Sequence, residues 1–76
     1  MDLASLQRAF GAEIRRRREA LGISQEALAF RSELHRTYVS LLERGLRNPS
    51  LGVIAQLAEA LDTPMVSIVR DVEKRA

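Results

Sequence analysis

The stretch from Ser24 to Gly45 constrains the fold of this chain more than any other part of the sequence. Its residues are arranged as expected for two helices of about eight residues, joined by a tight turn at residues 32–34. Ser24 is a favourable N-cap residue, and Gly45 stands where glycine commonly ends a helix. Two such short helices are unstable alone in water, so further helices must pack behind them. The stretch therefore predicts a helix-turn-helix motif at residues 24–45.

Three further segments predict the supporting helices. From about Ser5 to Leu21, apolar residues recur at spacings of three, four and seven, which places them on one helix face. Another helix is expected at residues 51–61, after Ser50 as its N-cap, and a last one at about 64–74, with Pro64 at or near its first position. The residues expected to face inward are Leu3, Leu6, Phe10, Ile14, Leu21, Leu28, Ala29, Val39, Leu42, Leu51, Ile54, Leu57, Ala58, Leu61, Met65, Ile68, Val69 and Val72. We therefore expect one all-α, compact five-helix domain at residues 1–76.

The composition excludes several ways of stabilising so small a domain. The chain has 76 residues and no cysteine, so neither a disulfide nor a cysteine zinc site adds to its core. Oligomerisation is the remaining common aid. No apolar run approaches the roughly 18 residues of a membrane span, and the N-terminus lacks the pattern of a signal peptide. Together with the absence of cysteine, this predicts a cytoplasmic protein without a membrane segment.

Residues suited to catalysis or metal binding are few. His35 is the single histidine, and the position one turn further on is Val39 rather than a second ligand. The glycines are isolated and form no phosphate-binding loop. Five short helices also offer little room for a hydrolytic pocket. We therefore expect no metal, no cofactor and no enzymatic activity.

The positive charge gathers around the proposed motif. Residues 13–47 hold eight Arg and five Glu, a net charge of +3, whereas residues 48–76 hold two Arg, one Lys and four acidic residues, a net charge of −1. Of the twelve basic residues, eleven are arginines, which make two-pronged contacts with phosphates and guanine edges. This pattern favours a nucleic-acid partner, and a GC-rich genome that favours Arg codons is the alternative explanation of the arginine bias.

The run from Arg15 to Arg18 encircles its helix, so one of these side chains must point inward. Arg18 lies four residues after Ile14 and three before Leu21, on the apolar stripe. An inward arginine needs a carboxylate partner. Glu43, near the end of the second motif helix, is the candidate.

If the second motif helix, at about 36–44, enters a DNA major groove, its outward residues near the N-terminus meet base edges. These are Arg36, Thr37, Ser40 and Leu41, and an arginine there can bond guanine O6 and N7 together. Backbone phosphates would be held by residues in or near the two motif helices, namely Gln25, Tyr38, Arg44, Arg47 and Asn48. The alternative is that these are ordinary exposed polar residues, with Tyr38 a partly buried packing group.

The last predicted helix carries more apolar surface than packing on one side requires. Val66 lies beside the inward stripe and widens it towards Val69. We expect these two valines, with Arg70 and Glu73, to contact a second copy of the chain. The alternative is that the valines only cover the edge of the core.

The order of four segments, SQEALA, RTYVSLLERG, RNPSL and LAEALDTP, resembles the lambda-repressor/Cro-like helix-turn-helix family, also called the XRE family. The resemblance covers roughly residues 10–70. Its markers are Ser24-Gln25, Leu28-Ala29, Ser40, Glu43-Arg44-Gly45, Asn48-Pro49-Ser50 and Leu61. Within the family, the segment Leu34–Leu51 in so short a chain is most similar to the controller proteins of restriction–modification systems.

The resemblance implies a homodimeric transcription regulator that dimerises largely through its C-terminal helix. It implies that Arg18 pairs with Glu43, that Arg36 and Thr37 read bases, and that the residues matching Gln25, Tyr38, Arg47 and Asn48 contact phosphates. The partners expected are double-stranded operator DNA, a second copy and, in addition, RNA polymerase. Two recognition helices would enter successive major grooves of a pseudo-palindromic site, and protein concentration would control occupancy.

Two positions depart from the family pattern. Glu33 stands where the turn usually has glycine, and a positive φ at this residue would cost on the order of 1 kcal/mol. His35 stands where Ser or Thr usually caps the next helix, and it is instead a further candidate for a phosphate contact. Three alternatives stay open: a phage-type repressor, an antitoxin-linked regulator, and a protein-interaction module that has lost DNA binding.

Overall fold

The computed structural model describes residues 1–76 and contains five helices and no strand. The helices are α1 (Leu3–Ala20), α2 (Gln25–Ser32), α3 (Arg36–Glu43), α4 (Leu51–Ala60) and α5 (Met65–Arg75). The expected all-α, five-helix fold with a central helix-turn-helix is therefore confirmed. Each helix begins and ends within two residues of its expected bounds, and Pro64 is the N-cap of α5 rather than its first residue.

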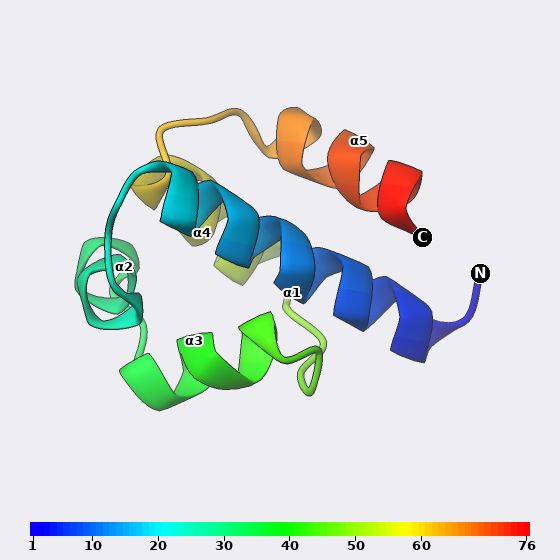
Figure 1. The fold of residues 1–76 in the computed structure, drawn as a ribbon, viewed down its shortest axis with the longest axis horizontal. Coiled ribbons are helices and arrows are strands. Elements are labelled where there is room, and N and C mark those ends of the chain that lie inside the picture. Colours follow the sequence, from blue (N-terminus) through cyan, green and yellow to red (C-terminus); the bar gives the residue numbers. More distant parts are fainter.

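Helix α1 runs through the middle of the molecule, with α3 on one side of it and α5 on the other (Figure 1). Helix α2 packs against α3 and α4, and α4 packs against α5. The chain measures 31 × 23 × 22 Å along its principal axes. The supporting helices thus hold α2 and α3 at one end and one edge of the domain.

The core consists of twelve buried apolar residues contributed by all five helices and by the residue that follows α4: Ala9, Phe10, Ile14, Leu28, Ala29, Val39, Leu42, Leu57, Ala58, Leu61, Ile68 and Val72. Most of the residues expected to face inward are among them or are half-buried beside them. Leu3, Leu21 and Leu51 are exposed by 54%, 49% and 74%, so their expected burial is wrong. All three lie in or next to a terminal turn of their helix. Val69, also expected inward, is 43% exposed.

The ends of the helices follow their capping residues. The hydroxyl of Ser24 accepts a hydrogen bond from the backbone N–H of Ala27 at 3.0 Å, and that of Ser50 accepts one from Val53 at 3.1 Å. Asp2, which the sequence had not suggested as a cap, accepts a bond from the N–H of Ser5 at 2.8 Å and begins α1. Gly45, with φ of +77°, ends the motif as expected.

The turn between α2 and α3 places a non-glycine residue in the left-handed region. Glu33 has φ of 59°, and the N–H of Leu34 donates to the carbonyl of Ala29 at 2.9 Å. The positive φ considered for Glu33 from the family pattern is thus present. His35 makes no side-chain capping bond to α3. Asp62, after α4, is a second non-glycine residue with positive φ, at 54°, which the sequence did not indicate.

No single helix is long and apolar enough to span a membrane. Helices α4 and α5 reach the required length and composition only when taken together, and they are bent by 107° at the break between them.

Candidate DNA-binding surface

The outward residues at the start of α3 lie beside the start of α2. Arg36 and Thr37 are exposed in the first turn of α3, and Ser40 is half-buried one turn further on. These three residues and Gln25, the first residue of α2, line one shallow polar hollow. The structure therefore brings together three of the four expected base-contacting residues. Leu41, the fourth, is half-buried and is not among the residues that line the hollow.

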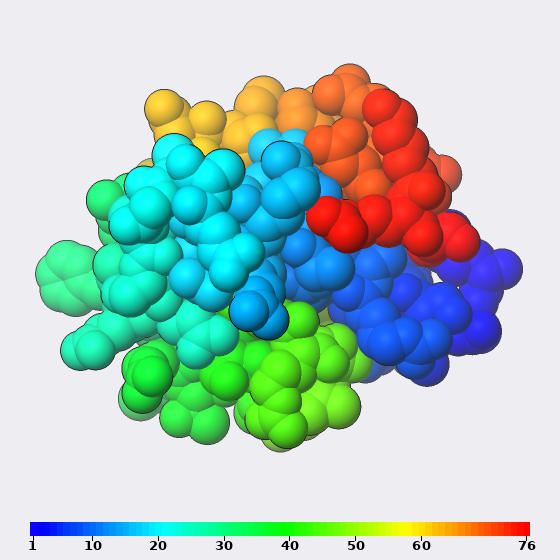
Figure 2. Space-filling view, viewed as in Figure 1, coloured from blue at the N-terminus to red at the C-terminus, as the bar shows by residue number.

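The expected phosphate-contacting residues flank α3 at both ends. His35 is exposed just before the helix, and Arg44, Arg47 and Asn48 are exposed just after it. Tyr38 is half-buried and its ring packs against the core. The ring therefore has a structural role, whether or not the hydroxyl also contacts a phosphate. Figure 2 shows α3 and the loop that follows it along one edge of the molecule, with α5 at the opposite edge. A ligand that lies along α3 would meet positive side chains beyond its C-terminal end.

Arg18 and Glu43 form the contact that the position of Arg18 on the inward stripe predicted. Arg18 Nε donates to Glu43 Oε2 at 2.7 Å and its Nη2 donates to Oε1 at 3.0 Å, while its Nη1 donates to the carbonyl of Ile23 at 2.9 Å. Glu43 is 9% exposed. The hydrogen bond to Glu43 raises the pKa of the Arg18 guanidinium above its ordinary value, so Arg18 keeps its positive charge. The pair fixes the C-terminal end of α3 to α1.

Gln25 takes part in the same contact. Its side-chain Nε2 donates to Glu43 Oε1 at 3.0 Å. The amide therefore joins the start of α2 to the end of α3 inside the protein. Its expected contact with a phosphate would use the remaining donor and the backbone N–H groups at the start of α2.

The expected dimer-contacting residues share one side of α5. Val66 is 66% and Val69 43% exposed, and Arg70 and Glu73 are exposed on the same side. Beside them is an apolar groove of about 160 Å³, whose lining includes Leu6 and Phe10 of α1, Pro49, Ile54, Val69 and Val72. The groove also includes Asn48, so it reaches from α5 to the loop that follows α3.

The arginine run contributes a second inward side chain that the sequence did not predict. Arg17 is only 17% exposed at its side chain, and it contacts Glu13 and Asp71. The i, i+4 spacing of Glu13 and Arg17 was the one available signal, because Asp71 lies 54 residues away in the chain. No group of three or more His, Asp or Glu side chains is arranged to hold a metal ion.

The fold and this surface define a helix-turn-helix protein of the lambda-repressor type. Residues 14–68 match the helix-turn-helix family, so the chain belongs to that family. Among its relatives is the control protein C.BamHI of Bacillus amyloliquefaciens, which is 49% identical over 53 residues, or 68% of this chain. The matched segment spans 65% of that relative's length, and as little as 28% of the length of other helix-turn-helix regulators that the chain matches.

Solved structures of controller proteins share this arrangement of helices over most of the chain. The restriction–modification controller protein C.AhdI from Aeromonas hydrophila is 48% identical and superposes with a TM-score of 0.80, covering 82% of this chain and 94% of its own. The controller protein C.Esp1396I, solved as a tetramer in complex with its natural 35 base-pair operator, is 30% identical with a TM-score of 0.84, covering 92% of each chain. The expected resemblance to controller proteins is thus confirmed.

Proposed function

We propose that this chain is a sequence-specific DNA-binding transcription regulator of the controller-protein kind, which acts without catalytic activity in the bacterial cytoplasm. The observation that carries the proposal is the exposed first turn of α3, which lies beside the start of α2, in a helix whose C-terminal end is fixed to α1 by Arg18 and Glu43. A recognition helix must present its N-terminal residues to base edges on a rigid support. The similarity to controller proteins, one of them solved on its operator, supports the same proposal.

Within this proposal, Arg36, Thr37, Ser40 and Leu41 contact bases. Arg36 is exposed and its side chain makes no hydrogen bond within the protein, so its guanidinium is available for the O6 and N7 acceptors of a guanine. Thr37 and Ser40 offer short hydroxyl groups, and Leu41 offers a methyl contact for thymine.

The phosphate contacts come from both ends of α3 and from the start of α2. Arg47 and Asn48 follow Gly45, and the Arg47 Nη1 donates to the neighbouring carbonyl of Leu46 at 2.9 Å, which leaves the other donors of this exposed side chain free for a phosphate. His35 lies just before α3, Tyr38 in its first turn and Arg44 just after it, and Gln25 begins α2. These residues would set the position of the protein on DNA without reading sequence.

The regulator acts as a homodimer in this proposal. The apolar groove beside Val69 supports a second copy at that surface, because it reaches the Asn48 loop and so lies next to the proposed DNA contacts. Two copies joined there would place two α3 helices on one face of the duplex, about 34 Å apart on a pseudo-palindromic site. For control of a promoter, we propose that two dimers bind adjacent sites and that the regulator contacts RNA polymerase.

Selection of binding sites from a pool of random-sequence duplexes tests the proposal. Binding of the selected duplex is then followed by fluorescence anisotropy over a range of salt concentrations. We expect an inverted repeat among the selected sites and a linear fall of log K with log salt. A protein-interaction module without DNA binding predicts no enrichment and no salt-dependent affinity. A nuclease gene next to a matching repeat in the genome would separate a controller protein from a phage-type repressor or an antitoxin-linked regulator.

A further inference from the structure

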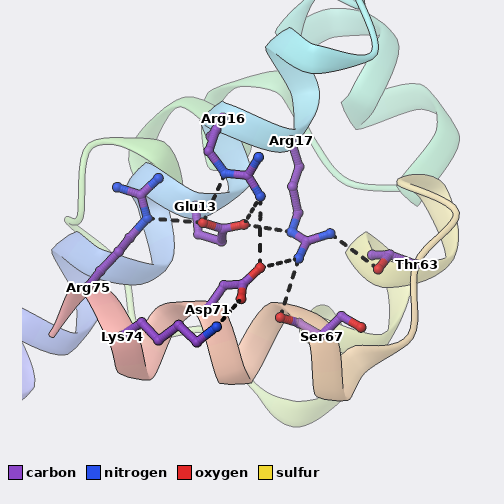
Figure 3. A network of polar contacts seen from close by, with 8 residues as sticks. All are labelled: Glu13, Arg16, Arg17, Thr63, Ser67, Asp71, Lys74 and Arg75. Carbon is purple, nitrogen blue, oxygen red and sulfur yellow. Dashed lines mark hydrogen bonds and ion pairs between the residues drawn. The ribbon is translucent and has the colours of Figure 1, made fainter.

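Arg17 joins three parts of the molecule through one guanidinium group (Figure 3). Its Nε donates to Oε2 of Glu13 in α1 at 2.7 Å, and its Nη1 donates to Oγ1 of Thr63, just before α5, at 3.2 Å. Its Nη2 donates to Oδ2 of Asp71 at 2.7 Å and to the carbonyl of Ser67 at 3.3 Å. One side chain of α1 therefore holds the approach to α5 and two successive turns of that helix.

Glu13 is the buried centre of the same group of side chains. It is 2% exposed, and it accepts hydrogen bonds from Arg16 at 2.6 Å, from Arg17 and from the Nε of Arg75 at 3.0 Å. Burial alone would raise the pKa of Glu13, but the bonds from these arginines outweigh it and lower the pKa to about 2. We call Glu13, Arg16, Arg17, Asp71 and Arg75 the α1–α5 ionic cluster.

Helix α5 has three distinct sides. Ile68 and Val72 are buried in the core. The residues of α5 that bond Arg17 or Glu13 of α1 follow one another at intervals of four and so form one line along the helix: Ser67, Asp71 and Arg75. The residues proposed to contact a second copy lie on the remaining side: Val66, Val69, Arg70 and Glu73. The cluster is therefore separate from the dimer surface but belongs to the same helix.

The two kinds of contact constrain α5 differently. Burial of Ile68 and Val72 holds the helix against the core, but apolar burial is not directional. Charge-assisted hydrogen bonds require particular distances and angles, so the contacts of Arg17 with Asp71 and with the Ser67 carbonyl fix how far α5 is rotated about its own axis. That rotation decides where Val69 points and what shape the groove between Val69 and α1 takes.

We propose that the α1–α5 ionic cluster positions α5 for contact with a second copy of this chain, with Arg17 and Asp71 as its positioning residues. This inference rests on the proposed homodimer. It assigns control of assembly to residues that touch neither the partner nor the DNA. Loss of the cluster would weaken dimerisation while leaving α2, α3 and the Arg18–Glu43 contact in place.

Asp71→Asn is the sharpest test, because it removes the negative charge that Arg17 contacts on α5, with little change of side-chain shape, and leaves Arg17 bonded to Glu13. The matched control is Glu59→Gln, which removes one negative charge from an exposed residue of α4 that makes no ion pair. Sedimentation equilibrium measures the dimer dissociation constant. Anisotropy at low salt measures binding to a selected two-fold duplex and to a duplex that carries one half-site.

We expect Asp71→Asn to raise the dimer dissociation constant about tenfold, through the loss of a charge-assisted hydrogen bond. Affinity for the two-fold duplex should fall with it, while affinity for the half-site stays that of the wild type. Glu59→Gln should match the wild type in all three measurements. Arg17→Lys, which keeps the charge but cannot make all four bonds, should shift dimerisation in the same direction as Asp71→Asn.

A wild-type dimer dissociation constant in both Asp71→Asn and Arg17→Lys would overturn the positioning role while leaving the proposed function intact. An equal loss of half-site affinity would also overturn it, because the cluster would then act on the whole domain. A wild-type chain that is monomeric in solution and on the two-fold duplex would overturn both the dimer and this inference.

Discussion

The backbone of Gly11 in α1 lies directly against the end of α3 at Glu43. A Cβ atom on Gly11 would lie 2.6 Å from the carbonyl oxygen of Glu43, and closer still to that of Leu42. Only glycine permits this approach. It also brings α1 near enough for Arg18 to reach Glu43 at 2.7 Å. A residue that weakens α1 as a helix former thus determines where α3 lies.

Gly11→Ala should therefore destabilise the protein. The added methyl group meets backbone atoms, which cannot rotate away, so α1 and α3 must separate at a cost of about 1–3 kcal/mol. Urea unfolding followed by circular dichroism measures the change as a shift of the midpoint at constant slope.

Gly52→Ala is the control for this substitution. Gly52 lies in the first turn of α4, and its Cβ would meet only the Ser50 hydroxyl at 3.8 Å. Alanine should leave stability unchanged there or raise it by up to about 1 kcal/mol through helix propensity. Equal effects of the two substitutions would contradict the close approach of α1 and α3.

Arg18 and Glu43 should be energetically coupled. Arg18→Met and Glu43→Gln each leave the remaining side chain as a buried charge without its oppositely charged partner, so each alone should cost about 3–5 kcal/mol. The double variant should cost less than the sum of the two. The exposed pair Arg15 and Glu19, 3.3 Å apart, is the control, for which coupling should be about 0.5 kcal/mol or less. If the losses of stability in Arg18→Met and Glu43→Gln are additive, the interaction between these two side chains does not stabilise the protein.

The helices and most of the core followed from sequence because helical periodicity is a local property. Ile14, Leu28, Val39 and Leu42 all belong to stripes that a few neighbouring residues define. Leu3 and Leu51 belong to such stripes as well, yet they are exposed. Periodicity tells which side of a helix is apolar, but it does not tell how far along that side the neighbouring helix extends.

The ionic contacts separate what sequence can predict from what it cannot. The inward position of Arg18 followed from its place between Ile14 and Leu21. Because an inward arginine needs a carboxylate partner, the sequence also predicted its contact with Glu43 in the motif. Arg17 lies just off that stripe, and its partner Asp71 belongs to a helix 54 residues away. Which flank of α1 is covered by α5 depends on the packing of the whole chain, so the α1–α5 ionic cluster could not be derived from spacing.

Stability should fall in acid through Glu13. Its pKa in the folded state is about 2, below the ordinary value of 4.5, so the unfolded chain takes up the proton first. The stabilisation is therefore complete above about pH 4.5 and is lost as the pH falls towards 2, by at most on the order of 3 kcal/mol. Urea unfolding at several pH values between 7 and 2.5 measures this loss.

Glu13→Gln isolates that contribution. The variant should be less stable than the wild type at pH 7, since Arg16, Arg17 and Arg75 lose their shared carboxylate. Its stability should change less between pH 4.5 and pH 2.5. If the variant and the wild type lose stability in parallel over this interval, Glu13 is not the group that titrates.

Arg36 and Arg47 should differ in what they contribute to DNA binding. Arg36 is exposed in the first turn of α3 and lines the hollow with Thr37, so Arg36→Ala should cost about 1–3 kcal/mol and relax preference at one base position. Arg47 lies beyond the end of α3, so Arg47→Ala should weaken all sequences alike and flatten the slope of log K against log salt by about one unit. Anisotropy with the selected duplex and its single-base variants measures both effects. Unchanged base preference in Arg36→Ala would remove this residue from the reading surface, and an unchanged salt slope in Arg47→Ala would remove its phosphate contact.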